Sequence, residues 1–372
     1  MGSLSRFSGR SSDASETRNY LIYAIFCFKD ASSNISNFID CYDPSNNSWH
    51  RVTSIPECTS SLGDNLVLKD FAMVSIGHHI YIIGGRLCRK VVGSNGTDIV
   101  EEKDVMVLNC VRRYDTRTDS WGTCKPMNSP RFNFACTVCG DKIYVAGGQG
   151  TLDQARGISS AEMYDTSLDE WRFLANMSTK RYKCVGATWQ GKIHVLGGFA
   201  EKGDDGDKIS GPFIMTRSSA EVYDAEHDSW KFLARMWDLD IPPYQIVAIN
   251  DKLFSSGDCL KPWKGHIEIY NETEKIWNVV HGSHCDNLSQ NFTQDNQVAP
   301  MRRMYLTMAP IGNQLYFLTG YKVPGGESRL RNEVHVFDTA SNGYGWRSFE
   351  PVMEEREKEL CGHCCVLMKH VS

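Results

Sequence analysis

Short apolar segments that end in glycine recur along the chain, separated by polar turns. The clearest lie at residues 80–85 (IYIIGG), 143–148 (IYVAGG) and 193–198 (IHVLGG), with weaker forms at 253–258 (LFSSGD) and 315–320 (LYFLTG). Short apolar runs bounded by turn residues predict buried β-strands. Because the unit returns every few tens of residues, the pattern indicates a propeller or a solenoid rather than one wound sheet.

The unit that contains residues 143–148, the third unit along the chain, illustrates the strands that each repeat should contain. Residues 132–139 alternate loosely, and 140–142 (Gly-Asp-Lys) supply a tight turn before the buried strand at 143–148. Residues 159–165 (SSAEMYD) alternate again, and a fourth strand begins at 171–175. The unit is therefore predicted to be a four-stranded antiparallel meander, which is one blade of a propeller.

An aromatic–acidic pair followed by a tryptophan marks six units, and the first five have identical spacing. Tyrosine and tryptophan on neighbouring strands can stack and still form hydrogen bonds. The upstream glycines suit strand ends where the backbone bends and packs closely. We interpret all these residues as structural: Gly84, Gly85, Gly147, Gly148, Gly197, Gly198 and Gly320 with Tyr42, Asp43, Trp49, Tyr114, Asp115, Trp121, Tyr164, Asp165, Trp171, Tyr223, Asp224, Trp230, Tyr270, Trp277, Phe337, Asp338 and Trp346.

These glycines, the Tyr-Asp pair and the tryptophan resemble the kelch motif over residues 20–368. With Met127 and Met177 four residues before Arg131 and Arg181, the repeats are similar to the kelch portion of plant F-box/kelch proteins. The resemblance implies an all-β, six-bladed kelch β-propeller with four antiparallel strands per blade. Residues 1–19 are polar and expected to be disordered, so the F-box function of that family is not carried over, and 369–372 form a tail.

The two ends of the repeat region predict how the ring closes. The first unit begins directly at the apolar strand 21–28 (LIYAIFCF), and the last unit is followed by an extra strand at 361–368 (CGHCCVLM). We expect this C-terminal strand to pair with the N-terminal blade, since closure removes exposed sheet edges.

Composition narrows the classes of partner. The chain has 372 residues and a formal charge of -5, which provides no basic surface for nucleic acid. Its 14 cysteines are scattered singly, as expected of reduced thiols, and no apolar stretch approaches the roughly 18–20 residues of a membrane span. We expect a monomer of the cytoplasm and/or nucleus that has no membrane segment, no cofactor and no metal.

The long connections should gather on one face of the propeller. Loops from second to third strands and links between blades emerge on the same side, whereas turns from first to second strands are minimal. Long loops on a rigid scaffold are the usual place for recognition, so this face is the expected surface for a protein partner. An equally open interpretation is that the segment 201–207 is a tolerated insertion. The long connections are residues 56–70, 86–107, 199–217, 281–301 and 321–332.

Four arginines at the start of innermost strands are candidates for partner binding. Arg131, Arg181 and Arg303 each lie twelve residues before the first apolar position of a second strand, and Arg356 has a comparable place before the last strand. The kelch resemblance implies a ring of arginines at a channel mouth that grips acidic peptides, a role that suits the guanidinium fork. The alternative is that each arginine braces its own blade through a backbone carbonyl or a neighbouring acid.

Three motifs look like chemical sites but have structural interpretations. The sequence CGHC at 361–364 lies in a strand rather than at the helix N-terminus that a redox dithiol requires. Cys136 and Cys139 should face opposite sides of a strand, which prevents shared zinc binding. Glu221, Asp224 and His227 resemble, with narrower spacing, the iron triad of plant nitrile-specifier proteins.

The chain is thus predicted to be a non-enzymatic protein–protein interaction module, a kelch scaffold or adaptor. It could recruit substrates to a ubiquitin ligase through another subunit. The alternative is a propeller enzyme, such as a sugar epimerase or an iron-dependent specifier-type protein. No P-loop, nucleophile elbow or H-E-x-x-H motif is present, and no catalytic residue is assigned.

Overall fold

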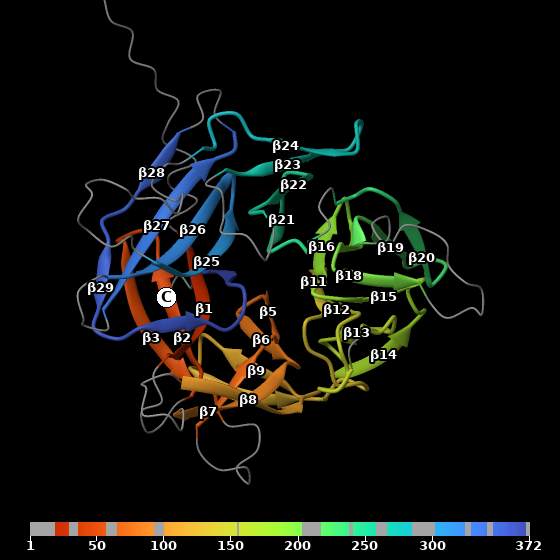
Figure 1. Ribbon diagram of the computed structural model, residues 1–372, viewed down its shortest axis with the longest axis horizontal. Coiled ribbons are helices and arrows are strands. Elements are labelled where there is room, and N and C mark those ends of the chain that lie inside the picture. Colours follow the sequence, from red (N-terminus) through yellow and green to blue (C-terminus); the bar gives the residue numbers. More distant parts are fainter. Residues whose placement is uncertain are drawn as a thin grey trace, which may run out of the picture.

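Antiparallel β-sheets make up the computed structural model of the chain (Figure 1). It describes residues 19–29, 36–56, 65–92, 100–154, 156–202, 217–237, 241–257, 266–284, 302–323, 329–340 and 345–369. Across these ranges, no helix is long and apolar enough to cross a bilayer. The expected all-β class is confirmed, whereas the disordered segment at 1–19 lies outside the described residues except for Asn19.

Six main sheets follow one another along the chain, and we number them in that order. The first contains β1 (Tyr20–Phe28), β2 (Phe38–Asp43), β3 (Ser48–Ser54), β30 (Lys358–Leu360) and β31 (Cys365–Met368). The second contains β5 (Ala72–Ile76), β6 (His79–Ile83), β9 (Val111–Asp115) and β10 (Ser120–Cys124). The third contains β11 (Ala135–Cys139), β12 (Lys142–Ala146), β13 (Ala161–Asp165) and β14 (Glu170–Leu174).

The remaining main sheets have the same order of strands. The fourth contains β16 (Val185–Trp189), β17 (Lys192–Leu196), β19 (Ala220–Asp224) and β20 (Ser229–Leu233). The fifth contains β21 (Ile246–Ile249), β22 (Lys252–Ser255), β23 (Glu268–Asn271) and β24 (Ile276–Val279). The sixth contains β25 (Arg302–Ile311), β26 (Gln314–Lys322), β27 (Leu330–Asp338), β28 (Trp346–Ser348) and β29 (Val352–Glu354).

The predicted meander of the third unit is confirmed, although its first strand starts later than expected. Residues 132–134 precede β11, since Phe132 forms an isolated bridge with Gln149 and Asn133 has a left-handed backbone with φ of 54°. This left-handed residue breaks the extended run, so the regular strand begins at Ala135.

The first strands of the second to fifth main sheets, β5, β11, β16 and β21, lie toward the middle of the molecule (Figure 1). The strands β5, β11, β16, β21 and β25 contact one another in this order, and β31 contacts both β25 and β5. The C-terminal strand pairs with the N-terminal sheet, as expected, through Tyr20↔Met368 to Tyr23↔Cys365. The strand predicted at 361–368 is shorter in the structure: only residues 365–368 form β31, and residues 361–364 connect it to β30.

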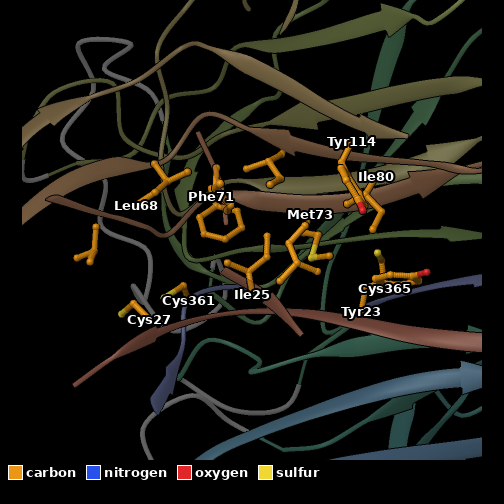
Figure 2. Close-up of a cluster of buried hydrophobic side chains, with 14 of the residues drawn as sticks. Tyr23, Ile25, Cys27, Leu68, Phe71, Met73, Ile80, Tyr114, Cys361 and Cys365 are labelled. Atoms are coloured by element: carbon orange, nitrogen blue, oxygen red, sulfur yellow. The ribbon is translucent and has the colours of Figure 1, made fainter. Parts of the chain in front are cut away.

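A cluster of buried apolar side chains fills the space between the first and second sheets. Figure 2 shows Tyr23, Ile25 and Cys27 of β1 in this cluster, together with Cys361 and Cys365 from the C-terminal segment. The described cysteines are free thiols, in agreement with the expectation of reduced cysteines. The chain ends are therefore joined by core packing as well as by backbone pairing.

The repeated tyrosine and acid build the turn between the third and fourth strands. Tyr164 Oη donates to Asp169 Oδ1 at 2.5 Å, and Asp165 Oδ1 accepts the backbone N–H of Ser167 at 3.0 Å. Asp169 itself has a φ of 51°, a left-handed conformation that aspartate tolerates better than most residues. Tyr42, Tyr114 and Tyr223 make the same bond to Asn47, Asp119 and Asp228.

The repeated tryptophan connects each sheet to the sheet before it. Trp171 Nε1 donates to the carbonyl of Lys125 at 2.9 Å, and Trp230 Nε1 donates to that of Ala175 at 2.8 Å. Trp277 and Trp346 likewise reach the carbonyls of Met236 and Ser283, while the tyrosine or phenylalanine of the same repeat packs against each ring. These contacts hold neighbouring sheets together, which is the role that the structural interpretation assigns to the repeat.

The glycine pair at the end of the second strand allows close approach of the segment that precedes the next main sheet. Gly147 has a φ of 68°, and a Cβ placed on it would lie 2.7 Å from the Arg181 carbonyl oxygen. The neighbouring Gly148 donates its N–H to that same carbonyl at 2.7 Å. Glycine is therefore required by close approach as well as by backbone conformation.

We expect Gly147→Ala to destabilise the protein by about 1–3 kcal/mol more than Gly140→Ala. Gly140 is a matched control, because its φ is 59° and a Cβ there would meet no atom within 4 Å. Both variants incur the cost of a left-handed alanine, whereas only Gly147→Ala collides with a neighbouring backbone. Urea unfolding measures the difference, and equal losses would contradict the close-approach explanation.

Candidate functional site

A cavity of about 480 Å³ lies at the N-terminal ends of the innermost strands. Each of four consecutive sheets contributes the start of its first strand, and the C-terminal segment completes the wall. We call this space the central cavity; its lining includes residues 70–74, 133, 134, 136, 183–186, 243–246 and 360–364. Its surface mixes apolar side chains with Asp70, Lys183 and His363, the composition expected of a binding cavity.

The rim of the central cavity is held by backbone hydrogen bonds between neighbouring sheets. Asn133 donates its N–H to the Asp70 carbonyl at 3.1 Å, and Lys183 donates to the Asn133 carbonyl at 2.7 Å. All three residues have left-handed backbones, with φ of 54°, 54° and 52°. Glycine would adopt this conformation without strain, so the side chains of Asp70 and Lys183 stand at the rim despite a backbone cost.

His363 lines the central cavity beside Tyr244, with the ring centroids 5.1 Å apart and nearly perpendicular. Burial lowers the pKa of His363 to about 4, while the Tyr244 backbone opposes this shift. Within the described part of the chain, its buried Nδ1 atom has no hydrogen-bond partner. The sequence offered only an indirect signal for this residue, its place in the closing segment.

Arg131 and Arg181 are buried, with no exposed surface. Arg131 Nη1 donates to the carbonyls of Gly147 and Ser160 at 3.0 Å each, and Nη2 lies 2.5 Å from Glu162 Oε1. These groups cannot be presented to a partner from such positions. The predicted arginine mouth is therefore wrong for Arg131 and Arg181, and the alternative of a brace within the blade describes them.

The second buried arginine repeats the geometry of the first. Arg181 donates to the carbonyls of Gly197 and Ser219, each at 3.1 Å, and pairs with Glu221 at 3.4 Å. Burial lowers the pKa of both guanidinium groups, and the paired glutamates oppose that shift. Sequence reasoning did not identify Glu162 or Glu221 as the partner of an arginine, although each lies two residues before the repeat tyrosine.

The other two predicted arginines lie apart from these braces. Arg303 is half-buried in β25, where burial lowers its pKa and Tyr321 and Tyr244 oppose the shift. Arg356 is exposed, and its guanidinium lies 3.7 Å from the centre of the Phe28 ring. The four arginines thus occupy three different environments rather than one ring.

Two small sheets occupy connections that the sequence predicted as long loops. The three-stranded sheet contains β4 (Leu66–Lys69), β7 (Arg86–Val92) and β8 (Val100–Val107), and the two-stranded sheet contains β15 (Thr179–Tyr182) and β18 (Phe199–Lys202). The prediction of a plain loop at 86–107 is corrected, because charged and β-branched residues there pair with β4. Most of the segments 201–207 and 281–301 lies outside the described residues.

The small sheets adjoin the rim of the central cavity. Asp70 directly follows β4, and Lys183 directly follows β15. Arg86, the first residue of β7, pairs with Asp70 at 2.5 Å between Nε and Oδ2. The short turns between first and second strands lie at the opposite ends of the same strands, so the added structure is on the side of the cavity.

The residues of the three motifs that resembled chemical sites do not form such sites in the structure. Glu221 is buried against Arg181, whereas Asp224 and His227 are exposed, so the three do not form the iron-type triad. Cys136 and Cys139 pack in two different apolar clusters, as expected for opposite faces of a strand. Burial raises the pKa of Cys364 to about 11, which keeps this thiol protonated and unreactive.

Comparison with known proteins supports the resemblance to kelch repeats. The family model described as Kelch motif matches residues 130–178. An F-box/kelch-repeat protein of Arabidopsis thaliana is 34% identical over 122 residues, which cover 33% of this chain and 29% of that protein. Kelch repeat and BTB domain-containing protein 12 of Homo sapiens is 28% identical over 123 residues, 33% of this chain and 17% of the relative.

The matched stretches span less than a third of these two relatives. A shorter match, 50% identical over 40 residues, relates 11% of this chain to 6% of Kelch-like protein 4 of Homo sapiens. The comparisons therefore concern the repeats themselves and not the other parts of these proteins.

We expect Arg131→Met to destabilise the protein by about 3–5 kcal/mol, because Glu162 would remain buried without its counter-charge. Arg356→Met is the matched control: its side chain is exposed, so its loss should cost less than about 1 kcal/mol. Chemical denaturation of the two variants measures both values. Similar small losses for both would show that the buried pair is not a structural brace.

We expect stability to fall more steeply with acid in the wild type than in His363→Phe. In the unfolded state this imidazole has its ordinary pKa of about 6.5, whereas in the folded state its pKa is about 4. The unfolded state therefore binds more protons between these pH values, and the free energy of unfolding decreases as the pH falls through them. Phenylalanine keeps a ring against Tyr244 and cannot titrate. Melting curves across this range test the difference, and identical slopes would contradict a neutral buried His363.

Proposed function

We propose that this chain, in which the kelch motif is present, forms a six-bladed β-propeller that acts as a non-enzymatic protein-interaction module. Six main sheets with equivalent strand order support the blade count. The succession of contacts from β5 to β31 and back to β5 supports closure of the ring, with β1 and β31 in one blade. Such closure leaves no innermost strand with an open side.

The single observation that carries the function is the placement of added structure beside the central cavity. Both small sheets adjoin its rim, and the rim residues Asp70 and Lys183 hold their side chains on strained left-handed backbones. The six main sheets pair their own strands without these small sheets, so the added structure is available for recognition. We infer that a segment of a protein partner binds across this rim and inserts into the cavity.

The relatives suggest the kind of complex in which such a module works. Their names combine kelch repeats with an F-box or a BTB domain. We propose that this chain is a monomeric adaptor of the cytoplasm and/or nucleus that could recruit a protein to a ubiquitin ligase through another subunit. It does not require nucleic acid or a membrane.

The alternative of a propeller enzyme has weaker support. Within the described residues, the two groups of three metal-ligating side chains lie outside the central cavity lining. The cavity lining offers one imidazole, His363, and one carboxylate, Asp70, which already pairs with Arg86. Stoichiometric iron or an epimerase activity in the purified protein would favour this alternative over the adaptor.

We expect Lys183→Glu to abolish capture of the partner from the native source, because it reverses the charge at the cavity rim. Lys192→Glu is the matched control, since Lys192 lies in the same sheet, begins β17 and faces the opposite end of the blade. Quantitative mass spectrometry compares the proteins retained by wild type and variants. We would reject the rim as the binding surface if the same amount of partner were retained by four proteins: the wild type, both variants and a form with a shortened 199–217 segment.

A further inference from the structure

Two adjacent histidines in the second sheet face the repeat carboxylate of the same sheet. His78 lies in the turn before β6, His79 begins this strand, and Asp115 ends β9. The Nε2 atoms of His78 and His79 lie 3.6 Å and 3.5 Å from Asp115 Oδ2. The three side chains, which we call the His-His-Asp cluster, are partly exposed at the opposite ends of the strands from the central cavity.

The third sheet has a lysine where the second has His79. His79 pairs with Asp115 in the ladder, and Lys142 pairs with Asp165 at the equivalent place. Lys142 Nζ lies 3.4 Å from Asp165 Oδ2, so an ammonium group neutralises that carboxylate. In the second sheet two imidazoles occupy this position, and uncharged imidazole is a ligand for a cation rather than a cation itself.

We propose that His78, His79 and Asp115 form a binding site for a divalent transition-metal ion, with zinc as the best match. Two imidazole nitrogens and one carboxylate oxygen are a common ligand set for zinc, and ligand atoms about 2.0–2.2 Å from a tetrahedral ion lie roughly 3.3–3.6 Å apart. The two measured separations from Asp115 agree with this spacing. The metal would occupy in this sheet the place of the lysine ammonium in the next.

The surrounding hydrogen bonds hold the ligands in place. Asp115 Oδ1 accepts the backbone N–H of Arg117 at 2.9 Å, which directs Oδ2 toward the imidazoles. The His78 carbonyl accepts the Thr116 N–H at 3.1 Å and its hydroxyl at 2.9 Å. Outer-shell contacts of this kind orient the ligands of metal sites. Each ligand side chain keeps about a quarter or a fifth of its surface exposed, so a fourth position remains open to water.

Arg117 is the competitor for this site. Its Nη2 lies 2.6 Å from His78 Nε2, the atom that would bind the metal. The arginine is exposed and can move away from the ring, but its charge opposes a cation. We therefore expect Arg117→Gln to tighten metal binding, a result that a purely structural histidine pair would not produce.

The test uses the full chain after removal of metal with EDTA. Calorimetric titration with zinc chloride should give one site of roughly micromolar affinity, and cobalt(II) should give the visible absorption of a tetrahedral complex. His79→Lys should weaken zinc binding by about tenfold or more, while Arg117→Gln should strengthen it several-fold. His227→Lys, in the exposed group with Asp224 and Glu226, should leave binding unchanged.

His79→Lys also controls for folding, because it recreates the Lys142–Asp165 arrangement of the next sheet. Its melting temperature without metal should match that of the wild type. Zinc that binds wild type and a folded His79→Lys equally would overturn the proposal, because another site would then be responsible. Absence of zinc binding by both wild type and Arg117→Gln at 100-fold excess over about 1 μM would overturn it as well.

Discussion

The junction between neighbouring main sheets depends on how buried backbone groups are satisfied where the two sheets meet. The buried residues Arg131 and Arg181 bind such groups both with their backbone and with their guanidinium group. The carbonyl of Arg131 accepts the N–H of Gly85 in the sheet before it, and its guanidinium binds the carbonyls of Gly147 and Ser160 in its own sheet. A buried acid then neutralises the charge, since an unpaired guanidinium would be very costly there. The glycine, the arginine and the glutamate thus form one unit.

At other junctions between sheets, different side chains bind the buried polar groups. Between the first and sixth sheets, Lys358 is buried and contacts Asp40 at 2.8 Å and Glu354 at 2.6 Å. The Asn37 amide both donates to and accepts from the backbone of Leu68, the position where other units have arginine. Replacement of arginine at one junction is therefore accompanied by new polar groups nearby, which explains why the repeats tolerate sequence variation.

The periodic pattern allowed the strands and the pairing of chain ends to be predicted, because strand periodicity and the repeat tryptophan are local signals. The environment of Arg131 could not be predicted in the same way, since burial depends on Glu162 and on the glycine of a neighbouring strand, which are distant in sequence. The sheet formed by β4, β7 and β8 was missed because its alternation is interrupted by a register shift between Leu87 and Cys88. The His-His-Asp cluster becomes visible only when the register of β6 and β9 is known.

The pairing of β1 with β31 has a consequence for the order of folding during synthesis. Each sheet of consecutive strands can form from local contacts as the ribosome releases it, but the ladder from Tyr20 to Met368 joins the two ends of the domain. Closing a loop of this length carries an entropic cost of about 5 kcal/mol, which local hairpins do not bear. Until β31 has been synthesised, β1 lacks this neighbour and leaves backbone groups open to pairing with other chains. The nascent protein is therefore exposed to such pairing for the whole interval between the synthesis of β1 and that of β31.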